Sequence, residues 1–179
     1  MEPKVLSYEH ARPEIKGGDV VFVRGKHSKL VQSLIMFFTK SAYSHVGFAF
    51  WMTTEDGSEN RLMMVEAQGG TKRRVVNMSF YEDRRLDVVN SPIAWNEIES
   101  CALSKLGLVE YGWLDVLYVG IHDFLLKYLG IKIPHANMPG ETCSEFVAKC
   151  LHLKETHISP QELFEALMKQ GCEIKIKVR

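Results

Sequence analysis

Short apolar runs separated by polar turns fill most of the first half of the chain, and this pattern predicts β-strands. We expect strands at residues 20–23, 45–51, 62–67, 73–76 and 85–89. A polar turn that contains Asp56-Gly57 joins the second strand to the third, which is typical of a β-hairpin. Because antiparallel partners place the start of one strand beside the end of the next, His45 and Glu66 are expected near neighbouring strand ends.

The second half of the chain shows apolar residues three or four positions apart, which predicts helices. Start and stop signals place these helices at residues 91–106, 113–129, 143–151 and 160–170, and a similar spacing predicts an earlier helix at 29–39. Residues 172–178 alternate apolar and charged side chains, like an edge strand whose lysines face solvent. Residues 1–16 are mixed in character and contain two prolines, so we expect a peripheral N-terminal arm.

Together these elements predict one α+β domain, residues 1–179, in which a central antiparallel sheet packs against helices. Of the 179 residues, 46% are hydrophobic and 25% are charged, which is enough for one sizeable core. The 22 basic residues balance the 22 acidic residues, so net charge provides no general attraction to nucleic acid or anionic lipid. We therefore expect no nucleic-acid partner, and the oligomeric state stays open.

The cysteines and the N-terminus both favour a cytoplasmic protein. The four cysteines lack the CxxC spacing of zinc sites and do not form a dense disulfide framework, which suits a reduced protein without a metal site. The first residues contain no apolar segment typical of a secretory signal. The most apolar run, residues 113–133, includes aspartate, histidine and lysine side chains, which argues against a transmembrane segment.

The sequence around Cys143 would place a thiol where a helix activates it. Thr142 followed by Glu145 fits a capping box, with Thr142 as the N-cap and Cys143 as the first helical residue. A thiolate there would lie among free backbone N–H groups at the positive end of the helix dipole, which favours the charged form. The same local pattern also fits a buried structural cysteine. Cys150 lies about two turns later without that advantage, so we expect it in the core.

Cys143, His45 and Glu66 supply the parts of a nucleophile–base–orienter triad. Cys143 would attack a carbonyl, His45 would accept the thiol proton and later donate one to the leaving group, and Glu66 would orient the imidazole. The oxyanion donors would be the Cys143 backbone N–H and a second group, for which Tyr43 is a candidate. Taken singly, His45 also fits a polar residue at a strand end, and Glu66 fits a solvated strand residue.

Four segments, in this order, resemble a known family. They are Gly18-Asp19-Val20-Val21-Phe22, Tyr43-Ser44-His45-Val46-Gly47, Val65-Glu66-Ala67 and Thr142-Cys143-Ser144-Glu145-Phe146-Val147. With the helix start at 159–163, they resemble the YiiX/YebB-like branch of the NlpC-type papain-like superfamily, over residues 17–170. That branch is circularly permuted, so its histidine and acidic residue precede the cysteine. The resemblance implies a circularly permuted papain-like fold.

The resemblance further implies a thiol peptidase or amidase that needs no cofactor. Its substrates would be cell-wall (peptidoglycan) peptides or related small peptides and amides, cleaved through a Cys143 acyl-enzyme. Some relatives act on lipid-linked acyl groups, so lipid-amide hydrolysis, acyl transfer and peripheral membrane contact stay open. Residues 111–115 resemble the family's pocket-side helix entry, which makes Tyr111 a candidate substrate-binding residue, although an ordinary helix start fits equally well. A hypothesis from a different class is a binding protein that keeps the fold without turnover.

Overall fold

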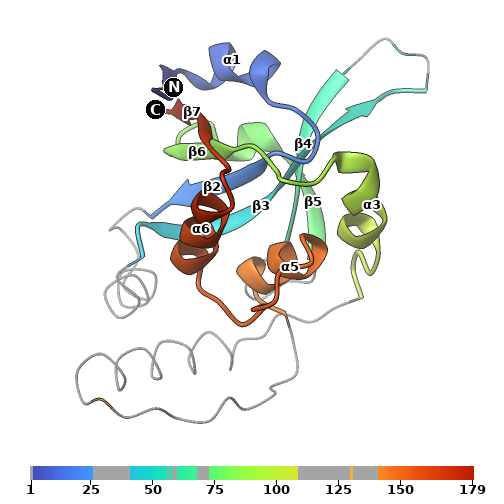
Figure 1. Cartoon of the computed structure of the whole chain (residues 1–179). Coiled ribbons are helices and arrows are strands. Elements are labelled where there is room, and N and C mark those ends of the chain that lie inside the picture. Colours follow the sequence, from blue (N-terminus) through green and yellow to red (C-terminus); the bar gives the residue numbers. More distant parts are fainter. Residues whose placement is uncertain are drawn as a thin grey trace.

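The computed structural model describes residues 2–25, 41–55, 57, 60–67, 73–108, 130 and 141–179. The helices expected at 29–39 and 113–129 lie outside these residues. The described residues form one seven-stranded mixed sheet with helices on both faces, an α+β arrangement (Figure 1). The strands are β1 (Lys4–Leu6), β2 (Val20–Arg24), β3 (Tyr43–Thr53), β4 (Asn60–Ala67), β5 (Arg73–Asn77), β6 (Leu86–Val89) and β7 (Ile174–Val178). Their order across the sheet is β1-β7-β6-β2-β3-β4-β5.

The central strands follow the predicted pattern of alternating or continuous apolar residues. β2 and β6 have apolar side chains buried on both faces of the sheet, which explains their nearly continuous apolar sequences. β3 and β4 form the expected hairpin, whose register runs from the pair Gly47 and Glu66 to the pair Thr53 and Asn60. This register places Glu66 at the end of the hairpin that is nearest to His45.

The sheet differs from the prediction at the β1 edge. Residues 174–178 are not an edge strand, because β7 lies between β6 and β1. The pairing of β1 with β7 is parallel, whereas the other strand pairs are antiparallel. The first 16 residues are also more than a peripheral arm: they supply β1, and Ala11 and Ile15 are fully buried. Both contributions depend on distant parts of the chain, because β1 pairs with β7 and the two buried side chains pack against strand residues far away in the sequence.

Three helices cover one face of the sheet, namely α3 (Trp95–Leu103), α5 (Cys143–Cys150) and α6 (Pro160–Lys169) (Figure 1). The other face is covered by α1 (Tyr8–Ala11), η1 (Arg12–Glu14) and η2 (Met78–Tyr81). Helices α5 and α6 begin at the predicted capping boxes, with Thr142 and Ser159 as N-caps. Helix α3 begins three residues later than the predicted first residue, Pro92, because the Ser91 hydroxyl accepts the Ile93 N–H and forms a bend.

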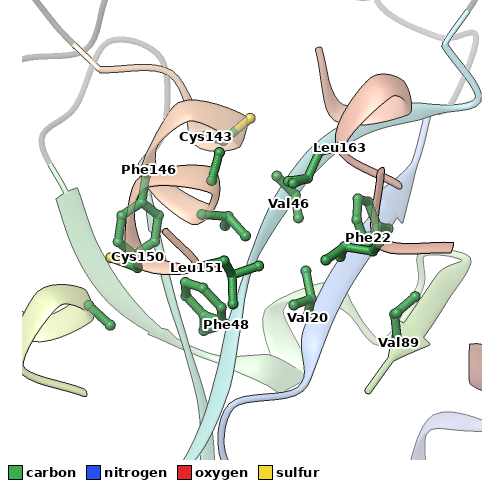
Figure 2. Close-up of a cluster of buried hydrophobic side chains, with 14 of the residues drawn as sticks. Val20, Phe22, Val46, Phe48, Val89, Cys143, Phe146, Cys150, Leu151 and Leu163 are labelled. Carbon is green, nitrogen blue, oxygen red and sulfur yellow. The ribbon is translucent and has the colours of Figure 1, made fainter. Parts of the chain in front are cut away.

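Each face of the sheet has its own apolar cluster. The cluster under the three helices includes Phe22 and Phe48 from the sheet and Phe146 from α5, where Phe48 and Phe146 meet edge to face. The cluster on the opposite face includes Met64, Met78 and other side chains of β4, β6 and η2. Figure 2 shows the first cluster, in which α5 contacts β3 with its apolar side chains. This packing fixes α5 over the centre of the sheet.

A disulfide joins Cys101 of α3 to Cys150 at the end of α5. The expectation of four reduced cysteines is therefore wrong for this pair, although Cys150 is buried as expected. The packing of α3 against α5 brings together two residues that are 49 positions apart in the sequence.

Within the parts of the chain that the structure describes, the helices are too short or too polar to cross a membrane. The apolar run at 113–133 lies almost entirely outside those parts.

Candidate active site

Cys143 is the first residue of α5, as the capping box predicts. The Glu145 N–H donates to Thr142 Oγ1 over 3.2 Å, and the Thr142 N–H donates to Glu145 Oε2 over 3.0 Å. These reciprocal bonds fix the start of the helix at the residue that carries the thiol. In Figure 2, the Cys143 sulfur points away from the apolar side chains that anchor α5. The free N–H groups at this end of the helix favour an anion at that sulfur.

His45 lies on β3, two residues before the hairpin register with β4 begins. It pairs with Val23 of β2 on one side, and within the described residues the pairing of β3 with β4 begins at Gly47 and Glu66. His45 Nε2 lies 2.9 Å from Glu66 Oε2, and the Cys143 thiol lies close enough to the ring to raise the pKa of His45. Since Nε2 is bonded to Glu66, the nitrogen that faces the sulfur is Nδ1. The three predicted residues therefore form a continuous chain from acid to base to thiol.

Glu66 is fully buried, and three side chains donate hydrogen bonds to its carboxylate. Oε2 accepts from His45 and from the Tyr81 hydroxyl, which lies 2.6 Å away, while Oε1 accepts from Arg74 Nε over 2.9 Å. The ring of Tyr81 also stacks on the ring of His45, with centroids 6.2 Å apart. Because both oxygens are fixed, Glu66 presents one orientation to the imidazole.

The charges of this site favour a protonated His45. Burial alone would lower the pKa of His45, but the Cys143 thiolate and the Glu66 carboxylate raise that pKa to about 10. Burial likewise opposes the charge on Glu66, yet hydrogen bonds from His45, Tyr81 and Arg74 hold the pKa of Glu66 below its usual value. Burial and the neighbouring Glu66 charge raise the pKa of Tyr81, so its hydroxyl stays a donor. The arrangement thus favours the imidazolium form of His45 beside the Cys143 sulfur.

Gly47 permits the close approach of β3 and β4 next to the side chains of His45 and Glu66. A Cβ atom at position 47 would lie 2.5 Å from the Val65 carbonyl oxygen and 2.6 Å from Met64 Cε. Gly47 is also the residue that pairs with Glu66. The absence of a side chain at this position therefore sets the distance between the strands that carry the base and the acid.

Tyr81 and Arg74 are site residues that the sequence analysis missed. Arg74 pairs directly with Glu66 across β4 and β5, so an opposite-charge pair in the second hairpin could have indicated it. Tyr81 reaches Glu66 from η2, a short helix after β5, and no local signal distinguishes it from a surface tyrosine. Its contribution follows only from the path of the chain after β5.

Tyr43 and Tyr111 were the candidates for oxyanion and substrate binding, and the structure describes only Tyr43. Tyr43 does not reach the triad as a free donor, because its hydroxyl donates to Asp87 Oδ2 over 2.6 Å and its ring packs against Phe22 and Phe164. The structure therefore does not support Tyr43 as an oxyanion donor. Tyr111 lies outside the described residues. Within the described ranges, no cluster of three or more histidine, cysteine or acidic side chains could hold a metal ion.

Cys143 and Cys172 are the two free cysteines, and they differ in their surroundings. Their exposures are similar, at 4% and 6%. Cys143 has the His45 imidazole as a partner, whereas burial raises the pKa of the Cys172 thiol. Cys172 is therefore a natural internal control for the reactivity of Cys143.

Chemically, the site can present a sulfur nucleophile and an imidazolium proton donor to the same carbonyl compound. Acyl transfer through a thioester requires both groups. No protein-family model matches the sequence, and no curated protein is significantly similar to it.

Proposed function

We propose that the protein is a thiol hydrolase of amide bonds with a circularly permuted papain-like fold. The observation that carries this proposal is the position of His45, which is hydrogen-bonded to Glu66 through Nε2 and lies close enough to the Cys143 thiol for Cys143 to raise its pKa. A base that activates a thiol needs both an orienting acid and the thiol itself, and His45 has Glu66 and Cys143 as these two neighbours. The order of His45, Glu66 and Cys143 in the chain also fits the permuted family that the sequence resembles.

The proposed reaction has two steps. In the first, the Cys143 thiolate attacks the amide carbonyl carbon, a C–S bond forms, and the C–N bond breaks as His45 donates its proton to the departing amine. In the second, water attacks the thioester while neutral His45 accepts a proton from it. The C–S bond then breaks, which releases a carboxylic acid and restores the thiolate–imidazolium pair. Glu66 keeps the imidazole in one orientation through both steps.

The Cys143 N–H is well placed to bind the oxyanion that forms on the carbonyl oxygen. It lies in the first turn of α5, where N–H groups have no acceptor within the helix, and it belongs to the same residue as the attacking sulfur. The substrate class that we propose, a cell-wall peptide or a related small peptide or amide, rests on the family resemblance.

The direct test is amide hydrolysis by matched cysteine variants. The purified protein is incubated with a mixture of peptidoglycan peptides, and newly formed amino groups are quantified. We expect the wild type and Cys172→Ala to release amines at similar rates, and Cys143→Ala to release none while it keeps its fold. His45→Ala should lose most of the activity, because neither the thiolate nor the departing amine then has a proton partner.

Two results would contradict the proposal. Turnover that persists in pure Cys143→Ala would exclude Cys143 as the nucleophile. A folded wild type that leaves both peptide and lipid-amide mixtures intact, with Cys143 no more reactive than Cys172, would favour a binding protein that has no turnover.

A further inference from the structure

Arg73 and Arg74 are adjacent on β5. Arg74 bonds Glu66 of the proposed triad, whereas Arg73 contacts the helix that carries Cys143 and the residue before its N-cap. Successive side chains of a strand point to opposite faces of its sheet. The Arg74 side chain lies on one face of the sheet and bonds the Glu66 carboxylate. The Arg73 side chain lies on the other face, which is covered by α3 and α5. Arg74 thus helps to fix the orientation of Glu66, whereas Arg73 touches none of the three triad residues.

The Arg73 guanidinium connects three parts of the chain. Its Nη1 donates to the carbonyl oxygens of Cys101 and Ser104, over 2.7 and 2.9 Å, at the C-terminal end of α3. Its Nη2 donates to Glu141 Oε2 over 2.5 Å. Glu141 directly precedes Thr142, the N-cap of α5. Arg73 therefore joins β5 and the end of α3 to the segment that leads into the nucleophile helix.

Arg73 also contacts α5 itself. Its guanidinium carbon lies 4.3 Å from the centroid of the Phe146 ring, a cation–π contact. Phe146 follows Cys143 by three residues, so it lies on the next turn of the helix, whereas Glu141 lies two residues before Cys143. One guanidinium thus holds the chain before and after the proposed nucleophile.

The ion pair of Arg73 and Glu141 is buried, with side-chain exposures of 4% and 8%. A buried charge pair needs good geometry to offset the loss of hydration, and loss of one partner leaves the other uncompensated. The second cation near Glu141 is Lys149, whose Nζ is 3.6 Å from Oε1 and whose side chain is 43% exposed. That contact is longer and more hydrated, so Arg73 is the main partner of Glu141.

We propose that Arg73 is a positioning residue for Cys143. It holds Glu141 and Phe146 in place, and this fixes the first turn of α5 so that the Cys143 sulfur meets His45. The inference rests on the proposed function, in which Cys143 is the nucleophile. Lysine cannot replace arginine here, because one ammonium group cannot bind two carbonyl oxygens and a carboxylate in the planar geometry of a guanidinium.

The test uses the rate of Cys143 alkylation by iodoacetamide as a function of pH, read by peptide mass spectrometry. The variant is Arg73→Lys, which keeps a positive charge beside Glu141. The matched control is Lys175→Met with Asp19→Asn, which removes the Lys175–Asp19 ion pair, an interaction of 2.6 Å outside the triad. Thermal unfolding is measured for both, so that a general loss of stability is recorded separately.

We expect Arg73→Lys to slow Cys143 alkylation near neutral pH about ten- to hundred-fold, because displacement of a reacting group by about 1 Å has effects of this size. The alkylation profile should move to higher pH, toward that of an ordinary thiol. The control should keep the wild-type profile even if its melting temperature falls. If Arg73→Lys does not fold, Glu141→Gln provides the same test, since its amide oxygen still accepts a bond but carries no charge.

An Arg73→Lys or Glu141→Gln protein with a wild-type alkylation profile would overturn the inference and leave the proposed function intact. If wild-type Cys143 itself reacts no faster than Cys172, both the proposed function and the role of Arg73 are overturned.

Discussion

His45 has an acid on one side and a thiol on the other, and both neighbours stabilise its protonated form. Its pKa of about 10 means that the imidazolium persists through neutral pH. In the proposed reaction, the imidazolium is the proton donor for the departing amine, and this donor is lost only as the pH rises through about 10.

The contribution of Glu66 is expected to appear in the alkaline limb of the pH–rate profile. In Glu66→Gln, the amide is neutral and no longer stabilises the imidazolium, so the pKa of His45 falls. Turnover should then decline at a lower pH than in the wild type, and it should be reduced less than in His45→Ala. Rates of amide release across pH measure this shift, and Glu162→Gln in α6 serves as the control. An unchanged alkaline limb would contradict the role of Glu66.

The three residues of the proposed triad could be selected from the sequence because each lies in a recognisable local pattern. Cys143 follows a capping box, and His45 and Glu66 occupy facing ends of a predicted hairpin. Tyr81 and Arg74 could not be assigned in the same way, since their contacts depend on the register of β5 and the path through η2. Tyr43 was misplaced because proximity in sequence to His45 does not reveal that its hydroxyl bonds Asp87.

Among the structural elements, α5 and α6 share the same capping box and so provide a matched pair. Thr142→Ala and Ser159→Ala should each lower the free energy of unfolding by about 1 kcal/mol, the usual effect of losing a capping side chain. Only Thr142→Ala should also slow the alkylation of Cys143, because that cap fixes the helix turn that carries the thiol. Denaturant unfolding and alkylation rates test both expectations. Equal alkylation rates in the two variants would show that the cap has no part in activating Cys143.

The β3–β4 pair provides a second prediction. Gly47→Ala should destabilise the protein by about 1–3 kcal/mol, because the new methyl group overlaps the Val65 carbonyl oxygen and the backbone must shift. The shift should also lengthen the contact of His45 with Glu66 and so reduce turnover. Gly17→Ala is a suitable control, because its methyl group would meet the Trp95 ring at an ordinary distance of 3.4 Å. A Gly47→Ala protein as stable and active as Gly17→Ala would contradict this account of Gly47.

Elements with strong local signals were predicted well, and those that depend on distant partners were not. The apolar runs of β2 and β3 and the caps of α5 and α6 all lie near their predicted positions. The prediction of β7 as an edge strand failed because its outer partner, β1, comes from the opposite end of the chain. Lys175, expected to face solvent, instead pairs with Asp19.

For the whole molecule, the disulfide ties α3 to α5 across a sequence separation of 49 residues. Closing a loop of this length lowers the entropy of the unfolded chain and contributes about 4 kcal/mol in the chain-entropy estimate. Cys101→Ser with Cys150→Ser should therefore lower the free energy of unfolding by up to that amount. The measurement is denaturant unfolding without reductant, and wild type with reductant should match the variant. Equal stability of the oxidised wild type and the variant would contradict this contribution.

The α+β class could be predicted from the order of strands and helices, because that order depends on local periodicity. The disulfide could not be predicted, because the positions of the four cysteines in the sequence do not reveal which helices pack together. The mixed character of the sheet depends likewise on the meeting of the two chain ends at β1 and β7 (Figure 1).

The central claim, that Cys143 is a nucleophile activated by His45 and Glu66, is tested most directly by mass spectrometry of the acyl-enzyme. The protein is incubated with peptidoglycan peptides and, separately, with lipid amides, then quenched with acid and digested. We predict an acyl group on the peptide that contains Cys143, absent from Cys143→Ala and strongly reduced in His45→Ala, with Cys172 unmodified. Amide cleavage without any adduct on Cys143 under rapid quenching, or equal acylation of Cys172, would contradict the account.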